Sequence, residues 1–207
     1  MLVTELHFLL LERYFSPIIP PANNHFGNSE GNVRNLVLCV FLALLWNGSV
    51  AAAELKVGDH ASDFRLKDSL GKEYSLGSPE LQGRVLYFNY SDPGSKDMNK
   101  HVDDALKSDQ GLDRKKNYTG LGIANMKASL LPDFAIARVI KSKQQETGAT
   151  ILLDDNYIIL NNWGLKNKVS NLVVLDKERI CRYIYKGKLP PDEVQRLINI
   201  IKEYQVK

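Results

Sequence analysis

The stretch that most constrains the fold is residues 84–90, where apolar and aromatic side chains follow one another with little interruption. Such a run is typical of a strand that is covered on both faces. A turn follows at once, and Met98, Val102 and Leu106 then recur at the spacing of a helix with one buried stripe. We therefore expect a central strand, a turn and an amphipathic helix capped by Ser95.

The remaining segments predict a three-layer α/β sandwich, with a central mixed sheet flanked by helices. Residues 64–66 and 74–76 predict an N-terminal hairpin, while residues 118–125 and 150–153 predict two strands parallel to the first. The segment that begins at Pro132 predicts a helix, and its expected apolar side consists of Phe134, Ala137, Val139 and Ile140. A short helix at 157–163, a second hairpin formed by 169–175 and 180–185, and a last amphipathic helix from residue 190 complete the order.

The N-terminal quarter of the chain has a different composition from the rest. Residues 1–32 fit no element of the predicted domain, and we expect them to be a spurious or disordered extension. Residues 33–53 combine one arginine, an apolar run and small residues, which is the pattern of a secretory signal peptide. The apolar run is about ten residues, too short to span a bilayer. We expect cleavage after residues 51–53, a single domain at 54–207 in the periplasm, and no stable membrane span in it. Translation from Val33 instead of Met1 is an alternative left open.

The charge pattern argues against nucleic-acid binding, and the cysteine content argues against a redox-active cysteine pair. The net charge is +3, and the cations alternate with acids, as in residues 100–104. That pattern is typical of a solvated surface and argues against a nucleic-acid partner. The chain has two cysteines, Cys39 and Cys181, and the first lies in the predicted signal peptide. The mature protein would then hold one thiol, with neither a CxxC pair nor an internal disulfide.

Cys181 lies on the second strand of the C-terminal hairpin. Because free cysteine is among the most buried residue types, we expect it to be a small core residue. The alternative is a lone reactive thiol, which would need an exposed and electropositive setting. Arg179 and Arg182 are near it in the sequence but do not establish such a setting.

Asp97 and His101 are four residues apart on the predicted helix and therefore share a face. Together with Asp92 and Asp155 they could in principle bind a metal ion. Two helical ligands without a cysteine or a second histidine make a poor site for a first-row metal. We expect a surface ion pair and no metal.

Gly94, Ser95 and Lys96 begin the predicted helix with backbone N–H groups and one cation, where a small anion could bind. The full spacing of a nucleotide-binding loop is absent. A helix cap with no ligand is the simpler interpretation.

Two sets of motifs resemble known families. Residues 61–76 and 81–89 resemble the opening of the peroxiredoxin and TlpA-like branch of the thioredoxin superfamily. Residues 163–165, 171–177 and 187–194 are similar to the bacterial YtfJ family, which is periplasmic, thioredoxin-like and functionally uncharacterised. The likeness covers most of residues 55–205 and implies a thioredoxin-like fold.

The superfamily's catalytic pattern is incomplete in this chain. The resemblance places the cysteine position within residues 91–95, which contain no cysteine. It also places a cis-proline before the strand near Leu172, but residues 168–171 contain no proline, so an ordinary trans peptide is expected. We therefore expect no dithiol redox activity.

The sequence thus predicts a secreted, cysteine-poor, thioredoxin-like protein that acts as a binding or accessory protein of the bacterial envelope, without catalytic residues, cofactor or metal. Its partner would be an envelope protein, a peptide or a small ligand, bound beyond the carboxyl ends of the parallel strands. The residues expected to converge there are Tyr90, Ser91, Asp92, Pro93, Gly94, Ser95, Lys96, Ser170 and Asn171. Two alternatives remain: an enzyme that uses Cys181 or the Asp-rich rim near Asp92, and a structural accessory protein with an apolar patch elsewhere.

Overall fold

The computed structural model describes residues 54–128 and 132–207. The predicted extension, the predicted signal peptide and Cys39 lie outside these residues. The elements, in chain order, are β1 (Leu66–Asp68), β2 (Glu73–Tyr74), β3 (Val85–Ser91), α2 (Lys100–Ser108), β4 (Tyr118–Asn125), η1 (Met126–Ala128), α3 (Asp133–Thr147), β5 (Thr150–Asp154), α4 (Ile158–Asn162), β6 (Asn171–Leu175), β7 (Cys181–Lys186) and α5 (Pro191–Val206). No helix within the described ranges is long and apolar enough to cross a membrane.

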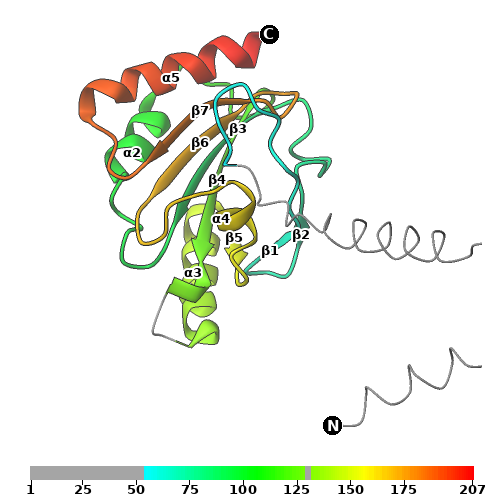
Figure 1. The fold of residues 1–207 in the computed structure, drawn as a ribbon, viewed down its shortest axis with the longest axis vertical. Coiled ribbons are helices and arrows are strands. Elements are labelled where there is room, and N and C mark those ends of the chain that lie inside the picture. The colour runs from blue at the N-terminus through cyan, green and yellow to red at the C-terminus, as the bar shows by residue number, and fades with distance from the viewer. Residues whose placement is uncertain (1–53, 129–131) are drawn as a thin grey trace, which may run out of the picture. The chain divides into compact units, whose positions relative to one another are not determined.

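The strands form one mixed sheet in the order β2-β1-β5-β4-β3-β6-β7 (Figure 1). Strands β3, β4 and β5 are parallel, whereas β6 runs antiparallel to β3 and β1 runs antiparallel to β5. The predicted central strand is confirmed, since β3 lies between β4 and β6 and buries all its residues except the last. Both predicted hairpins are present as β1–β2 and β6–β7.

The two faces of the sheet have separate cores. On one face, α2 and α5 pack their apolar residues against β3 and β6, with Val102 and Leu197 fully buried. On the other face, the rings of Phe64, Phe88 and Trp163 meet edge to face, with centroids 5.3–6.0 Å apart. The expected α/β sandwich is therefore confirmed.

The β3–α2 connection differs from the prediction. Turns occupy residues 93–99, and α2 begins only at Lys100. Ser95 does not cap that helix, because its hydroxyl accepts a hydrogen bond from the backbone N–H of Asp92, at 3.2 Å. The Asp92 carboxylate in turn binds backbone N–H groups that a helix would need, a local competition that is typical of aspartate.

The buried side of α3 was also predicted wrongly. Phe134 and Val139 are 77% and 69% exposed, whereas Ile136 and Gln144 are buried. The Gln144 side-chain amide donates a 3.0 Å hydrogen bond to the carboxylate of Asp68 in β1. Because Ile136 and Gln144 lie eight residues apart on one face of the helix, this polar contact fixes the rotation of α3.

Arg179 connects parts of the domain that are far apart in sequence. It lies in the β6–β7 turn with a left-handed φ of 68° and is almost completely buried. Its guanidinium donates to the carbonyl oxygens of Leu76, Leu81 and Arg84 at 2.7–3.1 Å. The segment that leads into β3 is thereby fastened to the turn between β6 and β7.

Candidate functional site

The turn after β3 is closed upon itself. The Asp92 Oδ1 atom accepts hydrogen bonds from the backbone N–H groups of Gly94 and Ser95, at 2.8 and 2.9 Å. These are the groups that the sequence offered as an anion site, and the carboxylate already occupies them. Lys96 forms an ion pair with Asp97 at the surface. The structure therefore gives no support to the alternative of an anion site at this turn.

Tyr90 is buried at the end of β3 on the same face as Phe88. Its hydroxyl donates to Oδ2 of Asp154, at 3.3 Å. The same carboxylate accepts the backbone N–H groups of Ile158 and Ile159, so that it caps α4. Burial, followed by the nearby charge of Asp154, raises the pKa of Tyr90 far above its usual value, and the phenol stays protonated.

Ser170 belongs to a buried hydrogen-bond network on the opposite face of the sheet. Its hydroxyl donates to Oδ1 of Asn89, at 2.8 Å, and accepts from Nδ2 of Asn99, at 2.9 Å. Asn99 also donates to the carbonyl of Gly187 and accepts the N–H of Leu189, both at 2.8 Å. Sequence reasoning missed Asn99, because the helix cap had been assigned to Ser95.

The network continues to Asp103 in α2. The hydroxyl of Tyr87 and the amide of Asn89 donate to its two carboxylate oxygens, at 3.0 and 3.1 Å. Burial raises the pKa of Asp103, although both hydrogen bonds act in the opposite direction. One signal could have revealed this network, since Asn89 is a polar residue inside an otherwise apolar strand.

Buried amides hold the loop before β6. The Asn171 side chain accepts the N–H of Lys166 and donates to the carbonyls of Lys166 and Val169, at 2.9–3.1 Å. Asn125 donates to the side chain of Asn167 in the same loop, at 3.1 Å. The expectation of a trans peptide is confirmed, since no cis bond occurs among the residues that the structure describes.

The structure brings the predicted site residues to one end of the sheet. Tyr90 lies opposite Asn171 in the β3–β6 ladder, and the Asp92 turn follows directly after β3. Most of their side chains are nevertheless engaged internally. Five are buried (Tyr90, Asp92, Ser95, Ser170 and Asn171), Ser91 and Pro93 are partly exposed, and Gly94 and Lys96 are exposed. A ligand approaching from solvent would therefore meet mainly the turn backbone and lysines.

Two oxygen atoms at this end have no hydrogen-bond partner. They are Oδ2 of Asp92 and Oδ1 of Asn125, both enclosed by protein. Ser91 of β3 pairs with Ala124 of β4. Asp92 and Asn125 come directly after these two paired residues and are therefore adjacent at this end of the sheet. A buried acceptor without a donor costs stability, so both atoms are energetically unfavourable where they lie.

Cys181 is fully buried, as expected. Burial raises the pKa of its thiol to about 11, so that it is protonated at neutral pH. Neither neighbouring arginine forms an ion pair with it, because Arg179 binds backbone carbonyls and Arg182 pairs with Asp176. The structure therefore gives no support to a reactive thiol.

The Asp97–His101 pair is absent. Asp97 pairs with Lys96, and Nε2 of His101 is 2.9 Å from the carbonyl oxygen of Leu189. In residues 54–128 and 132–207, no three His, Cys, Asp or Glu side chains lie close enough together to hold a metal ion.

Solved structures with a similar arrangement of strands and helices include a protein described as a disulfide isomerase and one described as peroxiredoxin-like. A candidate protein disulfide isomerase from Bacteroides thetaiotaomicron has a TM-score of 0.56 at 19% identity, with 74% of this chain and 92% of that chain covered. A peroxiredoxin-like protein from Aquifex aeolicus has a TM-score of 0.53 at 17% identity, with coverage of 73% and 91%. At these identities the likeness establishes the thioredoxin-like fold and no more.

Sequence comparison identifies relatives at the level of a family. An uncharacterized protein of Haemophilus influenzae is 28% identical over 127 residues, which cover 60% of this chain and 69% of the relative. Residues 59–204 match the family described as "Bacterial protein of unknown function (YtfJ_HI0045)". The expected resemblance is thus confirmed, and the chain belongs to the YtfJ_HI0045 family with a domain of thioredoxin-like fold.

Proposed function

We propose that this protein is a binding or accessory protein of the bacterial envelope and does not catalyse dithiol exchange. The observation that carries the proposal is the closed turn of residues 92–95. At the end of β3, where the superfamily resemblance places a cysteine, the chain has an aspartate bonded to its own backbone. The one cysteine in the described part of the chain is buried and protonated.

The binding surface would be the exposed rim at the carboxyl ends of the parallel strands. Ligands of open α/β sheets bind beyond these ends. Here the rim contains Gly94 and Lys96 from the turn, and Lys166, Asn167 and Lys168 from the loop before β6, all exposed. The buried amides of Asn125 and Asn171 hold that loop in one position, which lowers the cost of ordering it on binding.

Secretion is the second part of the proposal and rests on residues 33–53. If they act as a signal peptide, the mature protein in the periplasm begins between residues 52 and 54. Cell fractionation followed by intact-mass measurement tests this directly. A chain that stays in the cytoplasm at full length would contradict it.

Site-specific photocrosslinking in living bacteria tests the binding surface. A photoreactive residue replaces Lys96 at the rim, and a matched variant places it at Lys115, an exposed lysine in the loop before β4. We expect discrete crosslinked products from position 96 and none from position 115. Equal products at both positions, or none at position 96, would remove the support for this surface.

The enzyme alternative gains no support from the structure. Cys181 is inaccessible, and the Asp92 carboxylate is enclosed and bonded to its own turn. A disulfide-reduction assay on the full chain tests the proposed absence of dithiol exchange, and we expect no rate above background.

A further inference from the structure

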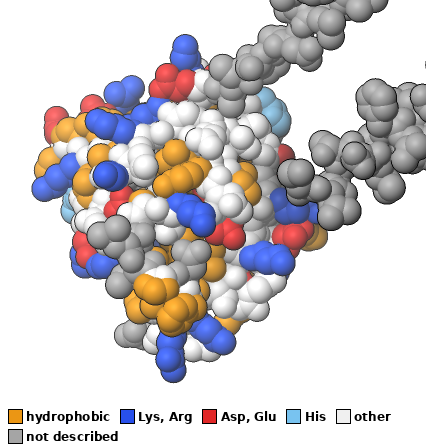
Figure 2. Space-filling view, turned by 60° about the horizontal axis from the view of Figure 1, so that its bottom comes forward, with side chains coloured by type: hydrophobic (Ala, Val, Ile, Leu, Met, Phe, Trp, Pro, Cys, Tyr) orange, Lys and Arg blue, Asp and Glu red, His pale blue; other side chains and the backbone are white. Residues whose placement is uncertain are grey.

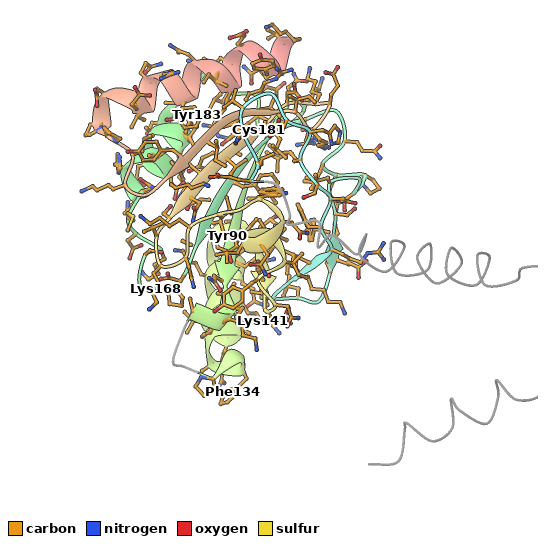
Figure 3. All side chains as sticks on the ribbon, viewed as in Figure 1. Tyr90, Phe134, Lys141, Lys168, Cys181 and Tyr183 are labelled. Atoms are coloured by element: carbon orange, nitrogen blue, oxygen red, sulfur yellow. The ribbon has the colours of Figure 1, made fainter. Side chains whose placement is uncertain are left out.

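A large apolar side chain is exposed at the end of the sheet that the proposed function assigns to binding. Phe134 lies in the first turn of α3 with 77% of its surface exposed. In Figure 3 it is the lowest labelled side chain, beyond the arrowhead of β4. An exposed phenylalanine at the tip of a domain buries little apolar surface, so its ring does not contribute to the core as aromatic side chains usually do.

Cations accompany this phenylalanine on the same side of α3. Arg138 and Lys141 follow at spacings of four and seven residues, which places all three on one exposed strip of the helix. On the loop before β6, which Asn125 at the end of β4 binds through Asn167, Lys166 and Lys168 are exposed as well. None of these four cations forms an ion pair within the described ranges. Their charge is therefore available to a partner.

The exposed acidic groups at this end are fewer than the cations. Asp92 and Asp154 are buried and bonded within the protein, Asp97 pairs with Lys96, and Asp155 is exposed. The exposed surface of this end, turned forward in Figure 2, shows hydrophobic side chains gathered beside Lys and Arg. We call Phe134, Arg138, Lys141, Lys166 and Lys168 the basic tip.

The shape of the tip favours a deformable partner. An acidic peptide binds best in a groove that can enclose its side chains. Here the apolar group projects outward, and a lipid interface can receive such a group without a complementary cavity. Lysine and arginine beside it are attracted to anionic headgroups over roughly 10 Å at moderate salt.

We infer that the basic tip docks the protein onto an anionic phospholipid surface, with Phe134 inserted at the interface and the four cations against the headgroups. This inference rests on the proposed role of the carboxyl-end rim as the binding surface and adds the chemistry of what the surface meets. It requires no membrane-spanning segment, because the contact is peripheral.

The test must separate the tip from the apolar residues 36–45, which could themselves bind vesicles. Tryptophan is therefore placed at the tip in the full chain, as Phe134→Trp, and its quenching by doxyl-labelled lipid is measured as the increase over the unsubstituted chain, whose Trp46 and Trp163 also fluoresce. The matched control is Val206→Trp at the end of α5, a position of similar exposure, 79% against 77%. We expect quenching at position 134 in vesicles that contain phosphatidylglycerol, and little in pure phosphatidylcholine or at position 206.

Charge reversal provides the second comparison. Arg138→Glu with Lys141→Glu, added to Phe134→Trp, should weaken binding to anionic vesicles about tenfold or more. The matched pair Lys115→Glu with Lys116→Glu removes the same charge from another exposed loop and should change it little. Equal quenching at positions 134 and 206, no quenching at 134, or equal effects of the two reversals would overturn the inference. Crosslinking at position 96 is scored separately, so its outcome remains a test of the proposed function alone.

Discussion

Asn99 shows how much a single side chain can organise. It is fully buried just before α2 and bonds with Ser170, Gly187 and Leu189, which belong to segments that follow it by 71–90 residues. An asparagine amide has both donors and an acceptor, and this one satisfies two backbone groups of the loop between β7 and α5. A hydrophobicity pattern does not report which hydrogen bonds a single polar side chain forms, and for this reason the role of Asn99 was not predicted.

Asp103 is the residue whose charge we expect to influence stability. Its pKa is raised in the folded protein, so the folded state binds the proton more tightly than the unfolded chain does. Its contribution to the free energy of unfolding is therefore largest in acid, and is lost as the pH rises from the ordinary value of about 3.9 through the raised value.

Asp103→Asn should remove this part of the pH dependence of the unfolding free energy in denaturant titrations. Asp103→Ala should cost about 1–3 kcal/mol, because Tyr87 and Asn89 lose their acceptor.

At the scale of elements, the strands were more predictable than the helix boundaries. The strand β3 is recognisable because nearly every residue in it is apolar, and Cys181 was correctly placed in the core. The start of α2 was misplaced because Asp92 captures the N–H groups of its own turn, a local bond that competes with helix formation. The buried side of α3 was misassigned because a polar contact, Gln144 with Asp68, decides it.

The corrected boundary of α2 predicts different costs for Ser95 and Asn99. Ser95→Ala removes one hydrogen bond within the turn and should cost about 1 kcal/mol. Asn99→Ala leaves several buried groups unpaired and should cost about 3 kcal/mol or more. Equilibrium unfolding measures both, and hydrogen exchange reports on α2. Increased exchange of the first α2 amides in Ser95→Ala would restore that residue as the cap.

The corrected rotation of α3 makes a second comparison possible. Ile136→Ala removes a buried side chain and should cost about 2–4 kcal/mol. Phe134→Ser alters an exposed side chain and should change stability by no more than about 0.5 kcal/mol. Denaturant midpoints decide between these orientations, and a large loss for Phe134→Ser would mean that the helix is turned the other way.

At the scale of the whole molecule, the order of elements was enough to predict the three layers. Alternating strands and helices specify a parallel sheet with helices on its faces, and the terminal hairpin adds antiparallel strands. The candidate site was predictable only in its location. Which of its side chains face solvent depends on hydrogen bonds between segments far apart in sequence, such as Ser170 with Asn89, and no local pattern encodes those.

The aromatic cluster of Phe64, Phe88 and Trp163 joins the N-terminal segment, β3 and the end of α4. Phe88→Ala removes the ring that contacts both others and should cost about 3–5 kcal/mol. Unfolding followed by circular dichroism and by tryptophan fluorescence should still give coincident transitions. Leu70→Ala, at an exposed position, serves as the control and should change the midpoint little. Separate transitions in the wild type would show that the two cores melt independently.

The buried guanidinium of Arg179 has a consequence for the time at which the domain acquires its structure. Its carbonyl partners at Leu76, Leu81 and Arg84 precede it by 95–103 residues. Until the ribosome has released residues 171–179, the segment before β3 lacks the hydrogen bonds to Arg179, and β3 lacks its neighbour β6. Non-local contacts of this kind form late and slow folding. A nascent chain that still lacks Arg179 therefore stays incompletely folded, which is the state that the proposed export through a translocation channel would require.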